Sequence, residues 1–234
     1  MIAIHQSQFI PWIPYFFKIF HSDTFVQLDD VQYQKNGLQN RNKIKTPQGD
    51  CWLTLPVKQK LGTPINQVEI TAVNKNISKI IKTIEINYKK STFFDEVNKI
   101  WDGINDVELN NLFALNNYIF EKIYNLLNLS SSTILSSTLN TVCKKQDLVI
   151  EIIKKNGDFD YLSGRGALEY MNLELFKQNN IRVYVTDFKY TEYPQLWTDR
   201  IGFIPNLSII DYLYNNLDSI LNYFAFNGSI SRII

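Results

Sequence analysis

The spacing of hydrophobic positions changes several times along the chain, and each change predicts a different element. Short apolar runs predict buried strands at 2–4, 24–28, 133–138, 159–162 and 182–188. Between these runs, apolar residues recur every three or four positions, which is typical of one face of a helix. This period predicts helices at 14–21, 77–84, 93–101, 108–127, 144–155, 169–178 and 208–223.

Strands and helices alternate after residue 132, and this order predicts a parallel sheet with helices on its faces. With the two N-terminal strands, the prediction is an α/β fold with an open, mainly parallel five-stranded sheet. Thr46-Pro47-Gln48-Gly49 is a turn signal between extended segments and predicts a β-hairpin over 40–57. A further short strand is predicted at 67–72. We expect one α/β domain over 1–234, with a helical insert at 74–132.

Composition narrows the classes of protein that fit. The chain has 234 residues, and 24 Lys and Arg against 23 Asp and Glu leave a net charge of +1. This charge argues against binding to duplex nucleic acid. Two cysteines and two histidines exclude a disulfide framework and a His-rich metal site. The apolar run 9–17 is too short to span a bilayer, and the N-terminal residues lack the features of a signal peptide. We expect a cytoplasmic protein without a transmembrane segment.

Candidate acids and bases stand where predicted strands end. In an open parallel sheet, ligands bind beyond the carboxyl ends of the strands, which selects residues 5–8, 29–30, 136–138 and 163–166. His5, Asp29 and Asp30 are the predicted catalytic residues at this edge. The aspartates are also candidates for binding Mg²⁺, although no cofactor is identified. The alternatives are a structural histidine and a pair of carboxylates that cap a strand end.

Two segments suit an anionic ligand. The turn 163–166 exposes backbone N–H groups beside two glycines, unless it is only a tight turn. Segment 35–45 carries four cations among amide side chains and can bind phosphates, unless it is a solvated polar face. Aromatic rings can stack on sugars, although most are expected in the core. No metal ligands are assigned, and the predicted substrate-binding residues are Gln6, Gln8, Trp12, Tyr15, Gln32, Lys35, Asn40, Arg41, Lys45, Trp52, Ser163, Gly164 and Gly166.

Several motifs together resemble the WbqC-like protein family. The opening motif is His5-Gln6-Ser7-Gln8-Phe9-Ile10-Pro11-Trp12, and further matches lie at 25–33, 39–44, 52–57, 193–196 and 203–211. The sequence departs from the pattern at Pro14, where such proteins usually have glycine. The resemblance covers nearly the whole chain. It implies a protein of O-antigen or capsule gene clusters, for which transfer of glycine to a sugar has been proposed, and it assigns no catalytic residues.

Three functions remain open. The leading one is acyl transfer, with glycine as a candidate, to an amino sugar that is nucleotide- or lipid-linked; the acyl donor is unknown. His5 or Asp29 would free the amine, and Gln6, Gln8 or the backbone of 164–166 would stabilise the oxyanion. The second is a nucleotidyltransferase or adenylate-forming enzyme using ATP and Mg²⁺. The third is a non-catalytic sugar-binding accessory protein, and a homodimer through 208–223 is a further candidate.

The second function rests on a layout. A strand, the segment 11–15, a helix and a strand ending in Asp resemble the nucleotidyltransferase/HUP-like layout. Trp12 and Tyr15 stand where the two histidines of that motif would lie, which argues against adenylyl transfer by the same mechanism.

Overall fold

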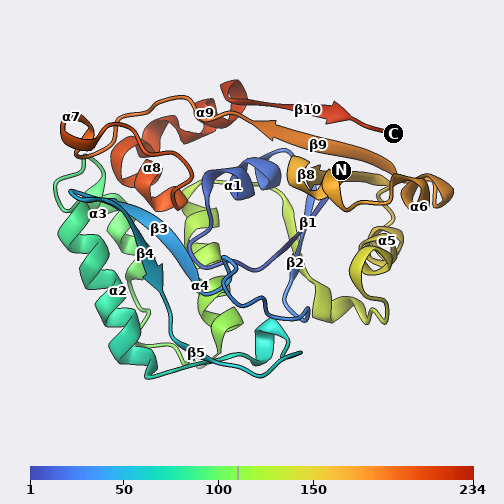
Figure 1. The fold of residues 1–234 in the computed structure, drawn as a ribbon, viewed down its shortest axis with the longest axis horizontal. Coiled ribbons are helices and arrows are strands. Elements are labelled where there is room, and N and C mark those ends of the chain that lie inside the picture. Colours follow the sequence, from blue (N-terminus) through green and yellow to red (C-terminus); the bar gives the residue numbers. More distant parts are fainter. Residues whose placement is uncertain (110) are drawn as a thin grey trace.

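A six-stranded sheet forms the centre of the computed structural model, which describes residues 1–109 and 111–234 (Figure 1). The strand order is β10-β9-β8-β1-β2-β7, and neighbours are parallel except for β10, which is antiparallel to β9. The strands are β1 (Ile2–Gln6), β2 (Thr24–Leu28), β7 (Ser132–Leu135), β8 (Asp160–Gly164), β9 (Arg182–Phe188) and β10 (Gly228–Arg232).

The predicted α/β class with a mostly parallel sheet is confirmed, but the predicted count of five strands omits β10. The sequence of β10 offers a weak signal, because Ile230 is its one apolar residue and the strand pairs only at the edge of the sheet. Predicted strand 133–138 ends early, because residues 136–139 form a 3₁₀-helix. Ser163 and Gly164, predicted in a turn, belong to β8.

Helices cover both faces of the sheet, because successive strand side chains point to opposite sides. Ala3 and Phe25 pack with α1 and α4, whereas Ile2 and Val26 pack with α5 and α6. The helices are α1 (Ile13–Phe20), α2 (Val73–Tyr88), α3 (Phe94–Asn98), α4 (Leu112–Leu126), α5 (Lys145–Asn156), α6 (Leu173–Gln178), α7 (Thr198–Ile201), α8 (Ile209–Asn216) and α9 (Ile220–Phe226).

The long segment between β2 and β7 carries the predicted hairpin, formed by β3 (Arg41–Thr46) and β4 (Gly49–Thr54). Predicted strand 67–72 shortens to β6 (Glu69–Ile70), which pairs with β5 (Val57–Lys58). The predicted helix 108–127 begins at Leu112 as α4, and position 110 lies outside the described residues. The predicted helix 208–223 is divided into α8 and α9 by a 3₁₀ turn.

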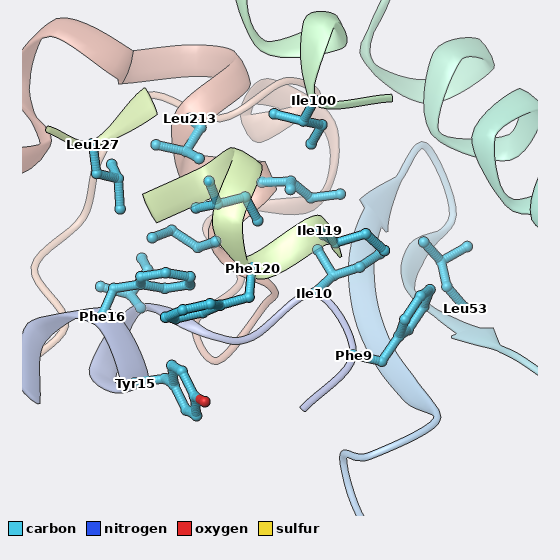
Figure 2. Close-up of a cluster of buried hydrophobic side chains, with 14 of the residues drawn as sticks. Phe9, Ile10, Tyr15, Phe16, Leu53, Ile100, Ile119, Phe120, Leu127 and Leu213 are labelled. Carbon is cyan, nitrogen blue, oxygen red and sulfur yellow. The ribbon is translucent and has the colours of Figure 1, made fainter. Parts of the chain in front are cut away.

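The segment after β1 belongs to the larger core. Figure 2 shows Phe9, Ile10 and Phe16 among buried side chains of α4 and the hairpin. Phe16 and Phe120 stack with their ring centroids 6.0 Å apart. Close packing leaves such side chains little freedom to move, so the chain that leaves β1 is held in a fixed course.

Ile10 has a backbone angle φ of +43°, a conformation that β-branched residues rarely adopt. Two long-range hydrogen bonds hold it there. The Ile10 carbonyl accepts from Asn42 Nδ2 at 2.7 Å and from Ser208 Oγ at 2.8 Å. Strain of this kind persists only where the surroundings impose it, and it is frequent near functional sites.

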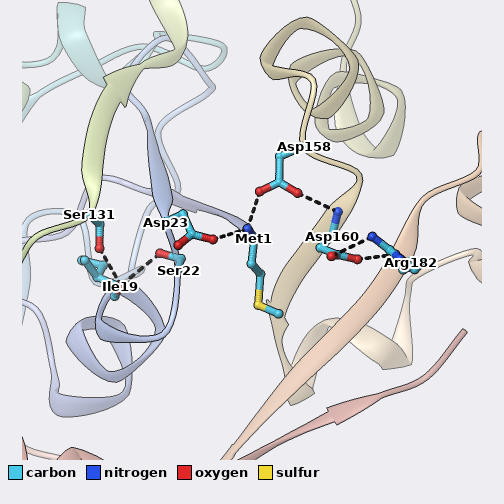
Figure 3. A network of polar contacts seen from close by, with 8 residues as sticks. All are labelled: Met1, Ile19, Ser22, Asp23, Ser131, Asp158, Asp160 and Arg182. Atoms are coloured by element: carbon cyan, nitrogen blue, oxygen red, sulfur yellow. Dashed lines mark hydrogen bonds and ion pairs between the residues drawn. The ribbon is translucent and has the colours of Figure 1, made fainter.

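The starts of the strands are joined by charged contacts (Figure 3). The Met1 amino group pairs with Asp23 at 2.5 Å and also with Asp158. Asp160 at the start of β8 accepts from Arg182 Nη2 at the start of β9, at 2.8 Å. These ion pairs lie at the amino edge of the sheet, so the polar groups at the opposite edge need a separate explanation.

Candidate functional site

The strands β1 and β8 diverge toward their carboxyl ends. β1 pairs with β2 as far as Gln6 but with β8 only as far as Ala3, while β8 pairs with β9 up to Gly164. After β1 the chain crosses to β2, on one side of the gap between β1 and β8. After β8 it crosses to β9, on the other side of this gap. This is the topological switch point of the sheet, the place where ligands bind in open α/β sheets. The side chains around it are therefore the candidates for a functional site.

His5 is a half-buried histidine near the carboxyl end of β1. Its ring lies edge-on to Tyr15, with 4.9 Å between centroids, and Nδ1 is 3.0 Å from the Gln6 carbonyl oxygen. A carbonyl oxygen only accepts, so this contact assigns the proton to Nδ1 and leaves Nε2 as an acceptor. Burial, together with the nearby Lys18 ammonium, lowers the pKa of His5 to about 3. His5 is therefore neutral at physiological pH.

This lowered pKa predicts a pH dependence of stability. An unfolded histidine titrates near pH 6.5, so as the pH falls from about 6.5 toward 3 the unfolded chain binds a proton that the folded protein does not. Stability is lost over this window, by about 2 kcal/mol between pH 7 and pH 5. Urea unfolding should show that His5→Gln loses about 2 kcal/mol less than wild type over this interval. Parallel losses in the two proteins would contradict the prediction. The same comparison between pH 7 and pH 8 is the control, because histidine is neutral there in both states.

Lys18 of α1 is a residue that the sequence analysis missed. Its side chain is 3% exposed, and Nζ donates to the Ile4 carbonyl at 3.0 Å. Burial lowers the pKa of this amine to about 7. No ion pair joins Lys18 to a carboxylate within the described residues. The available signal was that Lys18 is the one charged residue between positions 9 and 20.

Amide side chains line the neighbouring end of β1 and β2. Gln39 Nε2 donates to Gln6 Oε1 at 2.9 Å, and Asn116 Nδ2 donates to the Gln39 carbonyl at 2.8 Å. Gln27, the register partner of His5, donates to Asn117 Oδ1 at 3.3 Å. Of these, only Gln6 was predicted as a site residue. The arrangement gives this end of the sheet a polar lining beneath helix α4.

Three buried polar atoms in this region have no hydrogen-bond partner in the described part of the chain. They are Ser7 Oγ, Gln8 Oε1 and Asn116 Oδ1. A buried polar atom left unpaired costs about 1–3 kcal/mol. Buried polar atoms in proteins are nearly always hydrogen-bonded to protein, ordered water or a ligand, so these three atoms need a partner. A polar ligand could supply the missing partners.

Asp29 and Asp30 are engaged in a different task. Asp29 is buried, and its Oδ1 accepts from Ser136 Oγ at 3.0 Å and from the Ser137 N–H at 2.9 Å. Asn66 Nδ2 donates to the other Asp29 oxygen at 3.2 Å, and Asp30 also accepts from Ser136 Oγ. These bonds tie the end of β2 to the end of β7, which favours the structural alternative for Asp29. Within the described residues, no three His, Cys, Asp or Glu side chains come together as a metal site.

Three predicted substrate-binding residues lie in the interior. Lys45 is fully buried and donates to the Gln195 side chain at 2.9 Å, the Thr198 hydroxyl at 3.3 Å and the Gly202 carbonyl at 2.6 Å. Tyr15 packs against Phe25 and Phe120 in the core, so its ring faces are not free for a sugar. Asn40 is buried and donates to the Leu55 carbonyl at 2.8 Å.

The outer face of the hairpin carries a second polar group. The Arg41 guanidinium carbon lies 4.4 Å from the centre of the Trp52 ring, and Lys43 Nζ lies 5.1 Å from it. Trp52 is 44% exposed. Lys35 and Gln32 are exposed in the loop before the hairpin. This cationic and aromatic surface belongs to the hairpin and not to the sheet edge.

The remaining predicted residues lie close to the switch point or beside it. Ser163 is buried at the end of β8 and accepts from Tyr161 OH at 3.4 Å. A side chain added at Gly164 or Gly166 would meet no atom within 4 Å, so both glycines face open space. Trp12 is half-buried and directly precedes α1, and its backbone forms an isolated antiparallel β-bridge with Ser208.

Comparison with known proteins agrees with the motifs. The model of the WbqC-like protein family matches residues 6–223. The uncharacterized protein Rv1507c of Mycobacterium tuberculosis (strain ATCC 25618 / H37Rv) is 33% identical over 221 residues, which cover 92% of this chain and 93% of that protein. No solved structure matches the chain. Among the described helices, none is long and apolar enough to cross a membrane.

Proposed function

Because the chain belongs to the WbqC-like protein family, we propose that it is an enzyme of bacterial surface-polysaccharide biosynthesis that transfers an acyl group to an amino sugar. Family membership is consistent with a polysaccharide-cluster protein. Glycine is the leading candidate for the acyl group, and a nucleotide- or lipid-linked sugar is the proposed acceptor. The observation that carries the proposal is a neutral His5 at the switch point, beside buried polar atoms without partners.

The proposed reaction assigns a task to each of these groups. The sugar amine attacks the carbonyl carbon of the donor, a C–N bond forms, and the bond from the acyl carbon to the leaving group breaks. His5 Nε2 would accept the proton from the amine as the C–N bond forms, and its low pKa would make it return this proton readily to the leaving group. The Ser7 hydroxyl or the Gln8 amide would donate to the oxyanion, since the structure gives Ser7 Oγ no other partner. Asp29 would support the edge without taking part in proton transfer.

A nucleotidyltransferase is the second candidate, supported by the order of the parallel strands. The order β9-β8-β1-β2-β7 places the first strand at the centre, as in many nucleotide-binding α/β sheets. The HUP-like layout therefore remains a proposal. It predicts release of pyrophosphate in the presence of ATP and Mg²⁺.

A ligand screen by thermal shift, followed by mass spectrometry of the acceptor, tests the proposal. A ligand that binds only the folded protein raises its melting temperature. The screen contains free amino acids, nucleotides, and UDP-, dTDP- and CMP-linked amino sugars, with and without Mg²⁺. A shift with a nucleotide-linked amino sugar, and a mass gain equal to the acyl group on that sugar, would support acyl transfer. A shift with ATP and Mg²⁺ alone would favour the second candidate.

If the binding site extends from the sheet edge to the hairpin surface, replacing Arg41 by alanine should raise KM for the sugar substrate far more than it lowers stability. A charge-assisted hydrogen bond to a phosphate contributes about 1.5–3 kcal/mol, or roughly tenfold to a hundredfold in KM. Its exposed contact with Trp52 contributes about 0.5–1 kcal/mol to folding. Steady-state kinetics and urea unfolding measure the two effects. Lys58→Ala, at an exposed position of β5, is the matched control. Unchanged kinetics would remove Arg41 from the binding site.

A further inference from the structure

Lys18 has a buried amine, and no carboxylate of the described residues balances its charge when it is protonated. Its ammonium can donate three hydrogen bonds, and the structure gives it one acceptor, the Ile4 carbonyl. A charge removed from water without a partner is costly, and replacing it by an apolar side chain usually carries no penalty. A lysine at this position is therefore better explained by a ligand than by stability.

The ammonium also lies at a defined place in the sheet. Ile4, to which it donates, is the first residue of β1 beyond the last pair with β8. Helix α1 packs on β8 and β9, so its lysine faces the switch point. On the β8 side, the backbone at Gly164 borders open space. A ligand bound where β1 and β8 separate would therefore contact the Lys18 amine.

The titratable groups around Lys18 do not supply the missing negative charge. His5 of β1 is neutral, and Tyr15 of α1 is buried with a pKa raised by burial. Tyr184 of β9 packs against the same core cluster as α1. Strand β9 contains one acid, Asp187, and this residue forms an ion pair with Arg165 at 2.8 Å. Because no carboxylate of the described residues pairs with Lys18, its protonated amine can attract an anion at this point.

We propose that Lys18 is the counter-ion of a sugar-linked diphosphate that binds where β1 and β8 diverge. The inference deepens the proposed function and rests on it for the nature of the sugar. A diphosphate held by Lys18 would place the attached sugar beside His5, which is the next residue of β1 after Ile4. The diphosphate of a nucleotide sugar and that of a lipid-linked sugar share this chemistry.

Isothermal titration with two probes tests the inference. The probes are UDP-N-acetylglucosamine and farnesyl-diphospho-N-acetylglucosamine, whose diphosphate diesters do not titrate between pH 6 and pH 9 and which carry no amine. Binding requires protonated Lys18, whose pKa is about 7 without ligand. We expect wild-type affinity to fall about 25-fold from pH 6.5 to pH 8.5, and binding at pH 8.5 to take up close to one proton. Titrations in buffers of different ionisation enthalpy measure this uptake.

Variants separate Lys18 from the other lysines. Lys18→Met should weaken binding at pH 6.5 at least tenfold and abolish the proton uptake. Lys79→Met, at an exposed position of α2, should behave as wild type. Binding to wild type without proton uptake, or unchanged binding to Lys18→Met, would overturn the inference. The wild-type uptake is independent of how any variant folds.

The outcomes also separate this inference from the proposed function. If the acylated sugar is formed but neither diphosphate binds through Lys18, the inference fails and acyl transfer stands. If a diphosphate binds through Lys18 but no acyl donor yields product, the inference stands and acyl transfer fails. Binding of only one of the two probes identifies the nucleotide or the lipid as the natural carrier.

Discussion

Replacing Asp211 by alanine is expected to lower the free energy of unfolding by about 3–5 kcal/mol, because the change breaks a fully buried polar network. The Asp211 carboxylate accepts from Tyr88 OH at 2.7 Å, from Tyr193 OH at 2.9 Å and from Gln195 Nε2 at 2.7 Å. Gln195 in turn accepts from Lys45. Burial raises the pKa of Asp211, although the hydrogen bonds that it accepts oppose this shift. Without the carboxylate, the hydroxyls of Tyr88 and Tyr193 and one N–H of Gln195 would lose their acceptor, and Lys45 would lose a nearby negative charge.

Urea unfolding followed by tryptophan fluorescence measures the effect of this substitution. Asp218→Ala is the matched control, because Asp218 is exposed in the 3₁₀ turn after α8. It should change stability by less than about 0.5 kcal/mol. Asp211→Asn keeps one acceptor oxygen and should fall between wild type and the alanine variant. Equal stability of Asp211→Ala and Asp218→Ala would show that the network does not hold the hairpin to the C-terminal segment.

Replacing Lys18 by methionine is expected to stabilise the protein by about 1–4 kcal/mol at pH 7, because burial of an amine without a carboxylate partner disfavours the folded state. The sign follows from linkage. An unfolded lysine titrates near pH 10.4, and folded Lys18 has a pKa of about 7. Between these values the unfolded chain binds one more proton, so wild-type stability falls as the pH drops from about 10.4 to 7. The variant lacks this loss.

The stability difference between Lys18→Met and wild type should therefore shrink as the pH rises from 7 to 9.5, by up to about 1.4 kcal/mol per unit. Urea unfolding at pH 7.0, 8.0 and 9.5 measures it, with Lys79→Met as the control. A variant less stable than wild type at every pH would mean that the bond from Lys18 to Ile4 outweighs the cost of burying the amine. A gain in stability together with a loss of binding would identify Lys18 as a residue kept for function.

The sequence predicted the helices and strands in which the spacing of hydrophobic residues stays regular from end to end. Residues 24–28 and 182–188 form strands with the predicted ends. Strand β10 was not predicted, because it contains only one apolar side chain and is defined by its pairing with β9, a contact between distant parts of the chain. At the division between α8 and α9, Ser219 hydrogen-bonds to the Asn216 carbonyl and to Tyr212 OH. No pattern in the sequence predicts these bonds.

The candidate site was predicted as a region rather than as a set of side chains. Strand ends led to His5 and Asp29, because the carboxyl edge of a parallel sheet follows from the order of elements. Lys45 was grouped with Arg41 because both belong to the cation-rich segment 35–45. In the structure, residues 195–202 cover the end of β3 and bury Lys45. The spacing of residues in the sequence could not show this contact. Lys18 remained unseen, since a single lysine in an apolar helix usually extends its amine to water.

The hydrogen bond from Ser208 to the Ile10 carbonyl joins residues 198 positions apart in the chain. During synthesis, this bond to Ile10 cannot form until residue 208 has left the ribosome. Contacts of such long sequence separation form late, because loop closure must precede them. The course of the chain at Ile10, just after Ser7 and Gln8, would therefore be completed late in folding. A nascent chain would bind no substrate until residue 208 had emerged.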